Sequence, residues 1–240
     1  MAALLICGAA VLFTQDGFDR AVTVGLNHLN HVSFLFDAVC HGISENTTSS
    51  GLIFVALLWY CWFSSPDLRS RHNTLFGTVA SAVASLLSRM TQLMFPNRAR
   101  PFQDPSLHLT LPFTVQPDSL RHVASSFPSD HAALYFALAA TIYSVNRKVG
   151  YYAVALAVLL SGIRMYLGFH YFTDTLGGAG LGVLCVCLMQ SLKATRRTAA
   201  MCQTPSPAFY AVAFCVTYTI ATMFADVRVI ASQVAHLLRH

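Results

Sequence analysis

The chain contains 240 residues, of which 55% are hydrophobic and only 10% are charged, with a formal charge of +5. Soluble proteins typically carry about 25% charged residues, so a soluble domain of this size could not cover its surface with so few charges. With a mean hydropathy of +0.55, the chain is expected to place several helices in lipid. Its basic residues are dispersed between apolar segments, which argues against a nucleic-acid partner.

Apolar runs follow one another along the chain. They cover residues 1–13, 51–63, 75–95, 132–145, 149–167, 176–192 and 208–224. A membrane-spanning helix needs about 20 apolar residues, and flanking residues bring the shorter runs near that length. The runs between 51 and 192 are predicted to span, and the terminal runs bring the total to about six membrane helices in an all-α, polytopic bundle. Residues 18–43 mix histidine and aspartate with apolar side chains and are interpreted as an interfacial amphipathic segment.

Basic residues orient this bundle. They mark three connections, at Arg69 and Arg71, at Arg147 and Lys148, and at Lys193, Arg196 and Arg197. Their alternation along the chain puts all three connections on one side of the membrane, which the positive-inside rule assigns to the cytoplasm. The loop 96–128 and the turn near His170 then share the extracytoplasmic face, although they are far apart in sequence.

The first group of residues with chemical potential lies in that turn. His170 and Asp174 stand four residues apart, a spacing that puts two side chains on one face of a helix, within hydrogen-bonding reach. A carboxylate on one imidazole nitrogen would leave the other nitrogen free to attack. Arg164 precedes His170 by six residues and could bind two phosphate oxygens at once. Taken alone, the group is better explained as an interfacial histidine with a partner on the helix surface.

A second group precedes an apolar run. Ser129 and Asp130 are typical helix N-cap residues, and the first amides of a helix form a ready anion site. Ser129 adds a hydroxyl donor, and His131 stands on the expected first turn. Taken alone, this group favours plain helix capping.

A third group, Arg98 and Arg100 beside Pro101, follows the run 75–95. Taken alone, these are interfacial arginines whose charged ends reach the head-group region. All three groups are nevertheless predicted on one membrane face. Together they supply cations, a hydroxyl, helix-end amides, two histidines and a carboxylate. Phosphoryl transfer needs these parts for positioning, charge stabilisation, attack and proton donation, and the set provides them without a metal or another cofactor.

The three groups resemble the signature of the type 2 phosphatidic-acid phosphatase superfamily, which reads Lys-x6-Arg-Pro, then Pro-Ser-Gly-His, then Ser-Arg-x5-His-x3-Asp. The matching residues are Arg100-Pro101, Pro128-Ser129-x-His131 and Arg164-x5-His170-x3-Asp174. The signature lies within residues 93–174, and residues 1–240 are expected to form a single membrane-embedded phosphatase domain.

This resemblance implies a role for each matching residue. His170 would be the nucleophile that forms a phosphohistidine, and Asp174 would orient it. His131 would protonate the leaving group and later activate water. The phosphate would be held by Arg100, Ser129 and Arg164, with Arg98 and Asp130 as further candidates for substrate binding. The resemblance also implies a helical membrane bundle with no required metal.

The chain departs from the signature at three positions, where Leu93 replaces lysine, Asp130 replaces glycine and Ile163 replaces serine. The Asp130 variant resembles the branch that includes undecaprenyl-diphosphate phosphatases. The missing lysine removes a cation from the phosphate site. A charged residue within a membrane helix is costly and usually has a function, so Arg89 or Arg98 is hypothesised to compensate.

The leading functional prediction is a phosphatase of the bacterial inner membrane that acts on a lipid phosphate at the extracytoplasmic face, with undecaprenyl diphosphate as the lead substrate. Phosphatidate and phosphatidylglycerol phosphate are the alternative substrates. Vanadium haloperoxidases share the signature but are soluble, which the predicted spans disfavour. A non-catalytic protein that binds lipid phosphate, or a transporter, is kept open by Leu93.

Overall fold

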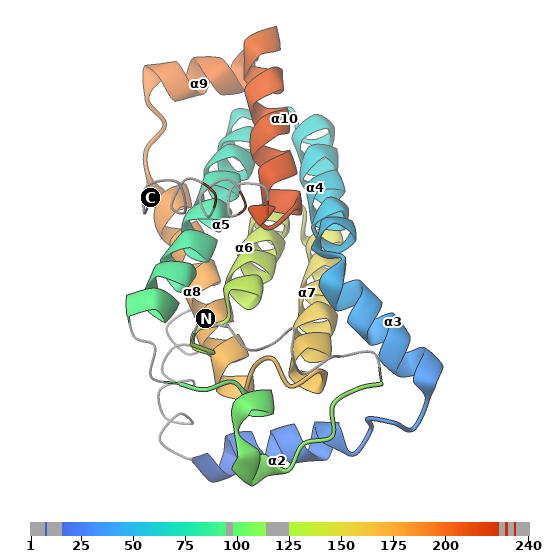
Figure 1. Ribbon diagram of the computed structural model, residues 1–240. Helices are drawn as coiled ribbons and strands as arrows, with labels where there is room; N and C mark the ends of the chain where they lie inside the picture. Colours follow the sequence, from blue (N-terminus) through green and yellow to red (C-terminus); the bar gives the residue numbers. More distant parts are fainter. Residues whose placement is uncertain are drawn as a thin grey trace.

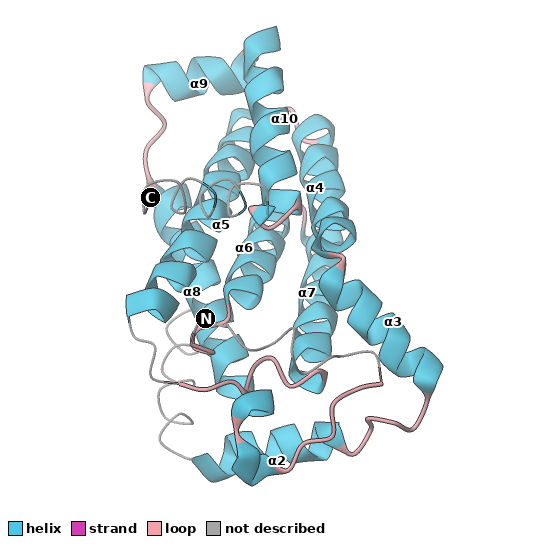
Figure 2. Cartoon of the chain, in the orientation of Figure 1, coloured by secondary structure: helices cyan, strands magenta, loops and turns pink. Residues whose placement is uncertain are grey.

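The computed structural model describes residues 16–94, 98–113 and 125–225, together with the single residues 8, 229 and 233. Within these ranges every regular element is a helix, and no strand occurs (Figure 2). The predicted all-α class is therefore confirmed. The first apolar run, 1–13, lies outside the described residues except for residue 8.

Helix α6 stands at the centre of the bundle (Figure 1). It packs against α4 (Thr47–Ser64), α5 (Leu68–Met94), α7 (Arg147–Tyr166) and α8 (Phe172–Ser191), and its own bounds are Asp130–Val145. The described part of each apolar run between 51 and 192 thus lies in one of these helices, apart from single residues at the ends of α7 and α8. The remaining elements are α2 (Asp16–Asn27), α3 (Phe34–Glu45), η1 (Pro101–Gln103), η2 (Pro105–Leu107), α9 (Arg196–Gln203) and α10 (Pro207–Ala221).

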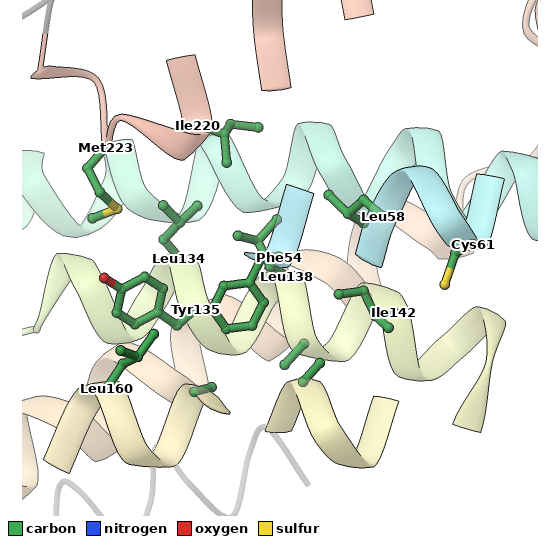
Figure 3. Close-up of a cluster of buried hydrophobic side chains, with 13 residues drawn as sticks. Phe54, Leu58, Cys61, Leu134, Tyr135, Leu138, Ile142, Leu160, Ile220 and Met223 are labelled. Carbon is green, nitrogen blue, oxygen red and sulfur yellow. The ribbon is translucent and has the colours of Figure 1, made fainter. Parts of the chain in front are cut away.

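The main hydrophobic core lies between α4, α6, α7 and α10 (Figure 3). Its fully buried members include Phe54, Leu134, Leu138, Ile142 and Ile220. Burying one such side chain contributes about 1.5–3 kcal/mol. Because α6 contributes three of these five residues, it is held by protein contacts on several sides.

Glycines allow α8 to approach the beginning of α6. A Cβ atom on Gly178 would lie 2.3 Å from the carbonyl oxygen of Ser129, and one on Gly182 would lie 2.3 Å from that of Ala133. Either contact is too close for a side chain, so only glycine permits this packing. The close approach brings the first turn of α8 beside the first turn of α6.

The basic connections lie together at the end of the bundle away from α2. The side-chain amide of Gln190, near the end of α8, donates to the carbonyl of Asn73 at 2.9 Å and to the hydroxyl of Ser144 at 3.0 Å. These bonds join the end of α8 to the start of α5 and the end of α6. The predicted grouping of the three basic connections is therefore observed, while α2 crosses the opposite end (Figure 1).

Helices α7 and α8 are long and apolar enough to cross a membrane, and α3 together with Ser50–Ser64 forms a third candidate that is bent by 58°. This supports two or three of the expected six spans. Helix α10 is apolar but short, α6 has only 16 residues, and α5 has 27 residues with serine and glutamine side chains buried against the bundle. The segment 18–43 forms the two helices α2 and α3 rather than one continuous stretch.

Candidate active site

The turn between α7 and α8 determines where His170 lies. Gly168 has a φ of 74°, in the left-handed region that favours glycine. The N–H of Phe169 donates to the carbonyl of Arg164 at 3.0 Å, a Schellman bond that closes α7. The carbonyl of Gly168 accepts the N–H of Phe102 at 3.1 Å. The chain therefore leaves α7 sharply, and His170 lies in the extended stretch before α8.

His170 is 1% exposed, and its two ring nitrogens have different surroundings. Nδ1 lies 2.9 Å from the carbonyl oxygen of Ser126. Because a carbonyl can only accept, Nδ1 carries the proton and Nε2 carries the lone pair. Nε2 is buried and has no hydrogen-bond partner among the described residues. A buried nitrogen with an uncommitted lone pair is the arrangement that a nucleophile requires.

His170 precedes α8 and Asp174 lies in its first turn, and the two side chains form the predicted pair as a longer ion-pair contact, not as a short hydrogen bond. Asp174 Oδ2 lies 3.8 Å from Nδ1 and accepts the N–H of Tyr171 at 2.7 Å, as a helix cap. Its Oδ1 accepts from Arg98 Nη1 at 2.7 Å. The carboxylate is fully buried and held in one orientation beside the imidazole ring.

Burial lowers the pKa of His170, because desolvation disfavours the charged imidazolium. The carboxylate of Asp174 opposes this effect, whereas the positive charges of Arg100 and Arg164 reinforce it. The net direction keeps His170 neutral at pH values where an exposed histidine is already partly protonated. A neutral imidazole is the form that can attack phosphorus.

The beginning of α6 holds the second histidine. Ser129 is the N-cap, and its Oγ accepts the N–H of Ala132 at 3.4 Å. Asp130 Oδ1 lies 3.0 Å from the ring Nδ1 of His131 and also accepts the backbone N–H of His131 at 3.0 Å. Two of the amides expected to face an anion are therefore bonded to side chains. Asp130, expected among the substrate-binding residues, lies instead against His131.

Two arginines contact Phe169, one at its backbone carbonyl and one at its ring. Arg100 is 5% exposed and donates from Nη1 to the Phe169 carbonyl at 3.2 Å. Arg164 lies over the Phe169 ring, 5.1 Å from its centroid, and donates to Ser44 Oγ at 3.0 Å. Burial lowers the pKa of Arg100 to about 10, with Asp130 opposing the shift and Arg164 reinforcing it. Arg100 is thus buried and Arg164 partly buried, and the two guanidinium groups lie close enough for the charge of one to affect the pKa of the other.

Arg98 occupies a bridge between two carboxylates. Its Nη2 lies 2.5 Å from Asp19 Oδ2, and its Nη1 lies 2.7 Å from Asp174 Oδ1. The guanidinium also stacks over the ring of Tyr171 at 4.4 Å. Because two carboxylates neutralise its charge, Arg98 is poorly suited to replace the missing lysine as a phosphate-binding cation.

The residue that replaces the lysine points away from the bundle. The side chain of Leu93 is apolar and 62% exposed, so it is unsuited to phosphate binding. Arg89, one turn earlier on α5, donates to Gln92 Oε1 at 3.0 Å, and Gln92 donates to the carbonyl of Pro128 at 2.6 Å. The charge of Arg89 also contributes to the lowered pKa of Arg100. Of the two compensating cations hypothesised from the sequence, Arg89 has the better surroundings.

Two buried residues of this region carried no signal in the sequence. Ser126 donates its N–H to the carbonyl of Arg98 at 3.0 Å and accepts from His170, while its buried Oγ has no partner among the described residues. Asp19 is buried on α2, in a segment interpreted only as interfacial. Neither residue belongs to the signature, and their contacts span many residues along the chain, so no local spacing could reveal them.

The three predicted groups thus meet at the α2 end of the bundle. Among the described ranges, histidine, cysteine, aspartate and glutamate side chains form no group of three or more that could hold a metal ion. The assembled side chains can hold an anion between guanidinium groups, present it to a buried imidazole nitrogen and offer a second imidazole for proton transfer.

Comparison with known sequences finds a family profile that matches part of the chain. The sequence profile of the PAP2 superfamily matches residues 83–198, which include all the site residues named above except Ser44 and Asp19. The bacitracin transport permease protein BcrC of Bacillus licheniformis is 29% identical over 133 residues, which cover 55% of this chain and 62% of the relative. The alignment therefore spans less than two thirds of that relative's length.

Two further similarities extend over more of the chain. The undecaprenyl-diphosphatase BcrC of Bacillus subtilis (strain 168) is 24% identical over 160 residues, covering 67% of this chain and 75% of the relative. The crystal structure of a transmembrane PAP2-type phosphatidylglycerolphosphate phosphatase from Bacillus subtilis has a TM-score of 0.54 at 22% identity, covering 81% of this chain and 96% of that chain. At that identity the likeness concerns the fold.

Proposed function

We propose that this chain, whose residues 83–198 match the sequence profile of the PAP2 superfamily, hydrolyses a lipid phosphate or diphosphate through a phosphohistidine at His170. One observation carries the proposal. The Nε2 atom of His170 is buried without a hydrogen-bond partner among the described residues, while the carbonyl of Ser126 fixes the proton on Nδ1. The guanidinium groups of Arg100 and Arg164 lie close enough to lower the pKa of the same ring.

The reaction proceeds in two displacements. In the first, the Nε2 lone pair of His170 attacks phosphorus, the bond from phosphorus to the leaving oxygen breaks, and His131 donates a proton to that oxygen. In the second, His131 takes a proton from water, the resulting hydroxide attacks phosphorus, and the phosphorus–nitrogen bond breaks to restore neutral His170. Arg100, Arg164 and Ser129 hold the phosphate oxygens, where they stabilise the charge of the transition state.

The electrostatics of the two histidines suit these roles. Asp130 Oδ1 accepts from Nδ1 of His131 at 3.0 Å, which orients the ring so that Nε2 is the atom that gives a proton to the leaving oxygen and later takes one from water. Asp174 lies 3.8 Å from Nδ1 of His170, where its charge stabilises the ring as the ring becomes cationic during attack.

The proposed setting is a bacterial inner membrane, with about six membrane helices and the site at the extracytoplasmic face. The candidate spans α7 and α8 support it, as does the grouping of the basic connections at the end away from the site. The positive-inside rule assigns that end to the cytoplasm. A site at the opposite end faces head groups, where lipid phosphates lie.

Undecaprenyl diphosphate is the proposed substrate. Asp130 in place of the family's glycine resembles the branch of undecaprenyl-diphosphate phosphatases, and the relative from Bacillus subtilis is named as an undecaprenyl-diphosphatase. Arg89 adds a third positive charge that acts on Arg100, which suits a diphosphate better than a monophosphate. Phosphatidylglycerol phosphate is the second candidate, because the similar crystal structure is that of a phosphatidylglycerolphosphate phosphatase. Phosphatidate follows it.

The experiment is a substrate panel. Purified protein in detergent is given equal concentrations of undecaprenyl diphosphate, phosphatidylglycerol phosphate or phosphatidate, and the release of inorganic phosphate is followed with time. His170→Ala, purified in the same way, sets the background. The proposal expects release above that background, with the largest kcat/KM for undecaprenyl diphosphate. Release no faster than the background on every lipid would indicate a non-catalytic binding protein. A preference for phosphatidylglycerol phosphate would replace the lead substrate.

A further inference from the structure

Asp19 is buried although it lies on the peripheral helix α2, which crosses the site end of the bundle (Figure 1). Its side chain is 2% exposed, whereas its neighbours Phe18 and Arg20 are exposed. A buried carboxylate is strongly destabilising unless it is paired and hydrogen-bonded. Asp19 lies outside the PAP2 signature, but its buried carboxylate requires a cation or hydrogen-bond donors in the core of the site.

The contacts of Asp19 lead to the first turn of α8. Its Oδ2 lies 2.5 Å from Arg98 Nη2 and also accepts from the hydroxyl of Thr173. Its Oδ1 accepts the backbone N–H of Thr173 at 3.1 Å. The first amides of a helix lack partners within the helix itself. Asp19 therefore caps α8 from another helix and holds Arg98 in the same contact.

Arg98 connects Asp19 to Asp174. The Nη1 of Arg98 donates to Asp174 Oδ1 at 2.7 Å and to Thr173 Oγ1 at 2.8 Å. The guanidinium is planar and rigid, so fixing one terminal nitrogen fixes the other. The result is a continuous chain of charge-assisted bonds from Asp19 through Arg98 to Asp174, whose carboxylate stands 3.8 Å from Nδ1 of His170.

We propose that Asp19 is a positioning residue for phosphoryl transfer, which acts through Arg98 to hold Asp174 beside the attacking histidine. This inference rests on the function proposed above and adds α2 to the reaction machinery. Asp19 touches neither phosphate nor His170. It sets the orientation of the carboxylate that stabilises the His170 ring while Nε2 forms its bond to phosphorus.

The proposal has a kinetic signature. Asp174 is important when the imidazole ring gains positive charge, which happens in the transition state and not when substrate binds. Loss of Asp19 is therefore expected to lower kcat by roughly 10- to 100-fold, as expected for a reacting group displaced by a fraction of an ångström. KM should change by less than about twofold, because ground-state binding is untouched.

The test is a double-mutant cycle with the purified full chain in detergent, using undecaprenyl diphosphate as the probe. The variants are Asp19→Asn, Arg98→Gln and the double variant. Arg20→Gln is the matched control, because Arg20 ties α2 to the loop through Ser106 at 3.0 Å and Asp104 at 3.7 Å without touching Arg98. The melting temperature of each variant is measured alongside kcat and KM.

The expected result is non-additive. Asp19→Asn and Arg98→Gln each lower kcat, the double variant is no slower than Arg98→Gln, and Arg20→Gln keeps wild-type kcat. Losses that multiply in the double variant would overturn the proposal, as would an equal loss of kcat in Arg20→Gln. A wild-type protein that releases no phosphate from any lipid of the substrate panel would refute the proposed function itself, so the two failures are distinguishable.

A second variant covers the case in which Asp19→Asn does not fold. Arg98→Lys keeps the positive charge but lacks the planar fork that joins two carboxylates. The proposal expects Arg98→Lys to lose kcat with little change in KM. Wild-type kcat in a folded Arg98→Lys protein would contradict it.

Discussion

Helices α6 and α8 each begin beside a histidine and an aspartate, but the two pairs are built differently. At α6, Nδ1 of His131 lies 3.0 Å from the carboxylate of Asp130. At α8, Nδ1 of His170 donates to the carbonyl of Ser126 at 2.9 Å, and the carboxylate of Asp174 is 3.8 Å away. The atom nearest to Nδ1 is thus an anionic carboxylate oxygen at His131 and a neutral carbonyl oxygen at His170.

The family signature names both residues only as histidine. The different partners of Nδ1 distinguish the proton-transfer role proposed for His131 from the nucleophilic role proposed for His170. At His131 a carboxylate in direct contact holds the ring through Nδ1 and leaves Nε2 to carry the proton that is transferred. A carbonyl fixes the tautomer without favouring the charged form, so the ring stays neutral and keeps its lone pair on Nε2. The surroundings of each ring therefore suit His131 to acid–base transfer and His170 to attack. The predictions below test this division.

The largest effect is expected at the attacking residue. His170→Ala removes the only group proposed to bond to phosphorus, and kcat should fall by about 10³-fold or more, as in enzymes that lose their nucleophile. Phosphate release from undecaprenyl diphosphate measures it, with the melting temperature as a control for folding. A variant as active as wild type would contradict the assignment of the nucleophile.

A smaller loss that depends on the leaving group is expected at the proton donor. His131→Gln should lower kcat on undecaprenyl diphosphate by roughly 10²- to 10⁴-fold, the usual contribution of general acid–base catalysis. On p-nitrophenyl phosphate, whose leaving group needs no proton, the rate of the first step should be largely kept. A burst of p-nitrophenol from His131→Gln measures that step. Equal slowing of the first step with both substrates would argue that His131 acts in some other way.

The next effect tests the phosphate-binding arginines that lie near both histidines. Arg100→Lys keeps a charge but loses the forked geometry that binds two oxygens at once, and kcat/KM should fall by roughly 10- to 100-fold. Steady-state kinetics on undecaprenyl diphosphate provides the measurement. If lysine at this position supported wild-type kcat/KM, then Arg100 would serve only as a point charge.

If Arg89 compensates for the missing lysine, two substitutions on α5 should differ modestly in their effect on kcat/KM. Arg89→Gln should lower kcat/KM by about tenfold, the value of one weakened charge-assisted contact. Leu93→Lys is the matched change on the same helix, and it should have little effect because Leu93 is 62% exposed and points away from the bundle. A gain of activity in Leu93→Lys, or no loss in Arg89→Gln, would show that the cation set is arranged differently.

The pH dependence should show the smallest effect. Attack requires neutral His170, and burial lowers the pKa of His170. The acid limb of kcat/KM should therefore have its midpoint below about 6.5, the value for an ordinary histidine. The profile is measured with wild type and with His131→Gln on p-nitrophenyl phosphate, so that the titration of His131 does not overlap. An acid limb above that value, kept in both proteins, would contradict a neutral buried nucleophile.

Most of the helical framework could be predicted from the sequence, because apolar runs between polar connections are sufficient to locate α4 to α8. The count of membrane spans could not. Hydropathy does not distinguish a helix buried by protein from one surrounded by lipid, and α6 is buried against its neighbours. Helix α5 shows the converse problem, since its buried serines and Gln92 lower its hydropathy although it is long.

The meeting of the three signature groups could also be predicted, from the alternation of basic connections. The detailed bonding could not. Helix α8 begins only at Phe172, so His170 lies before the helix that the four-residue spacing assumed it to share with Asp174. Ser126 replaces Asp174 as the direct partner of His170, and Asp19 reaches the site from α2. Such contacts depend on how distant segments pack, which no local pattern encodes.

The central claim is that His170 forms a covalent bond to phosphorus. Wild-type protein is mixed with undecaprenyl diphosphate carrying ³²P in its terminal phosphate, quenched in alkali, in which phosphohistidine survives, and digested for peptide mapping. The account predicts label on the peptide containing His170, attached to its Nε2 atom, and none in His170→Ala. Phosphate release by wild type without labelled protein at any time, or label on a different residue, would contradict it.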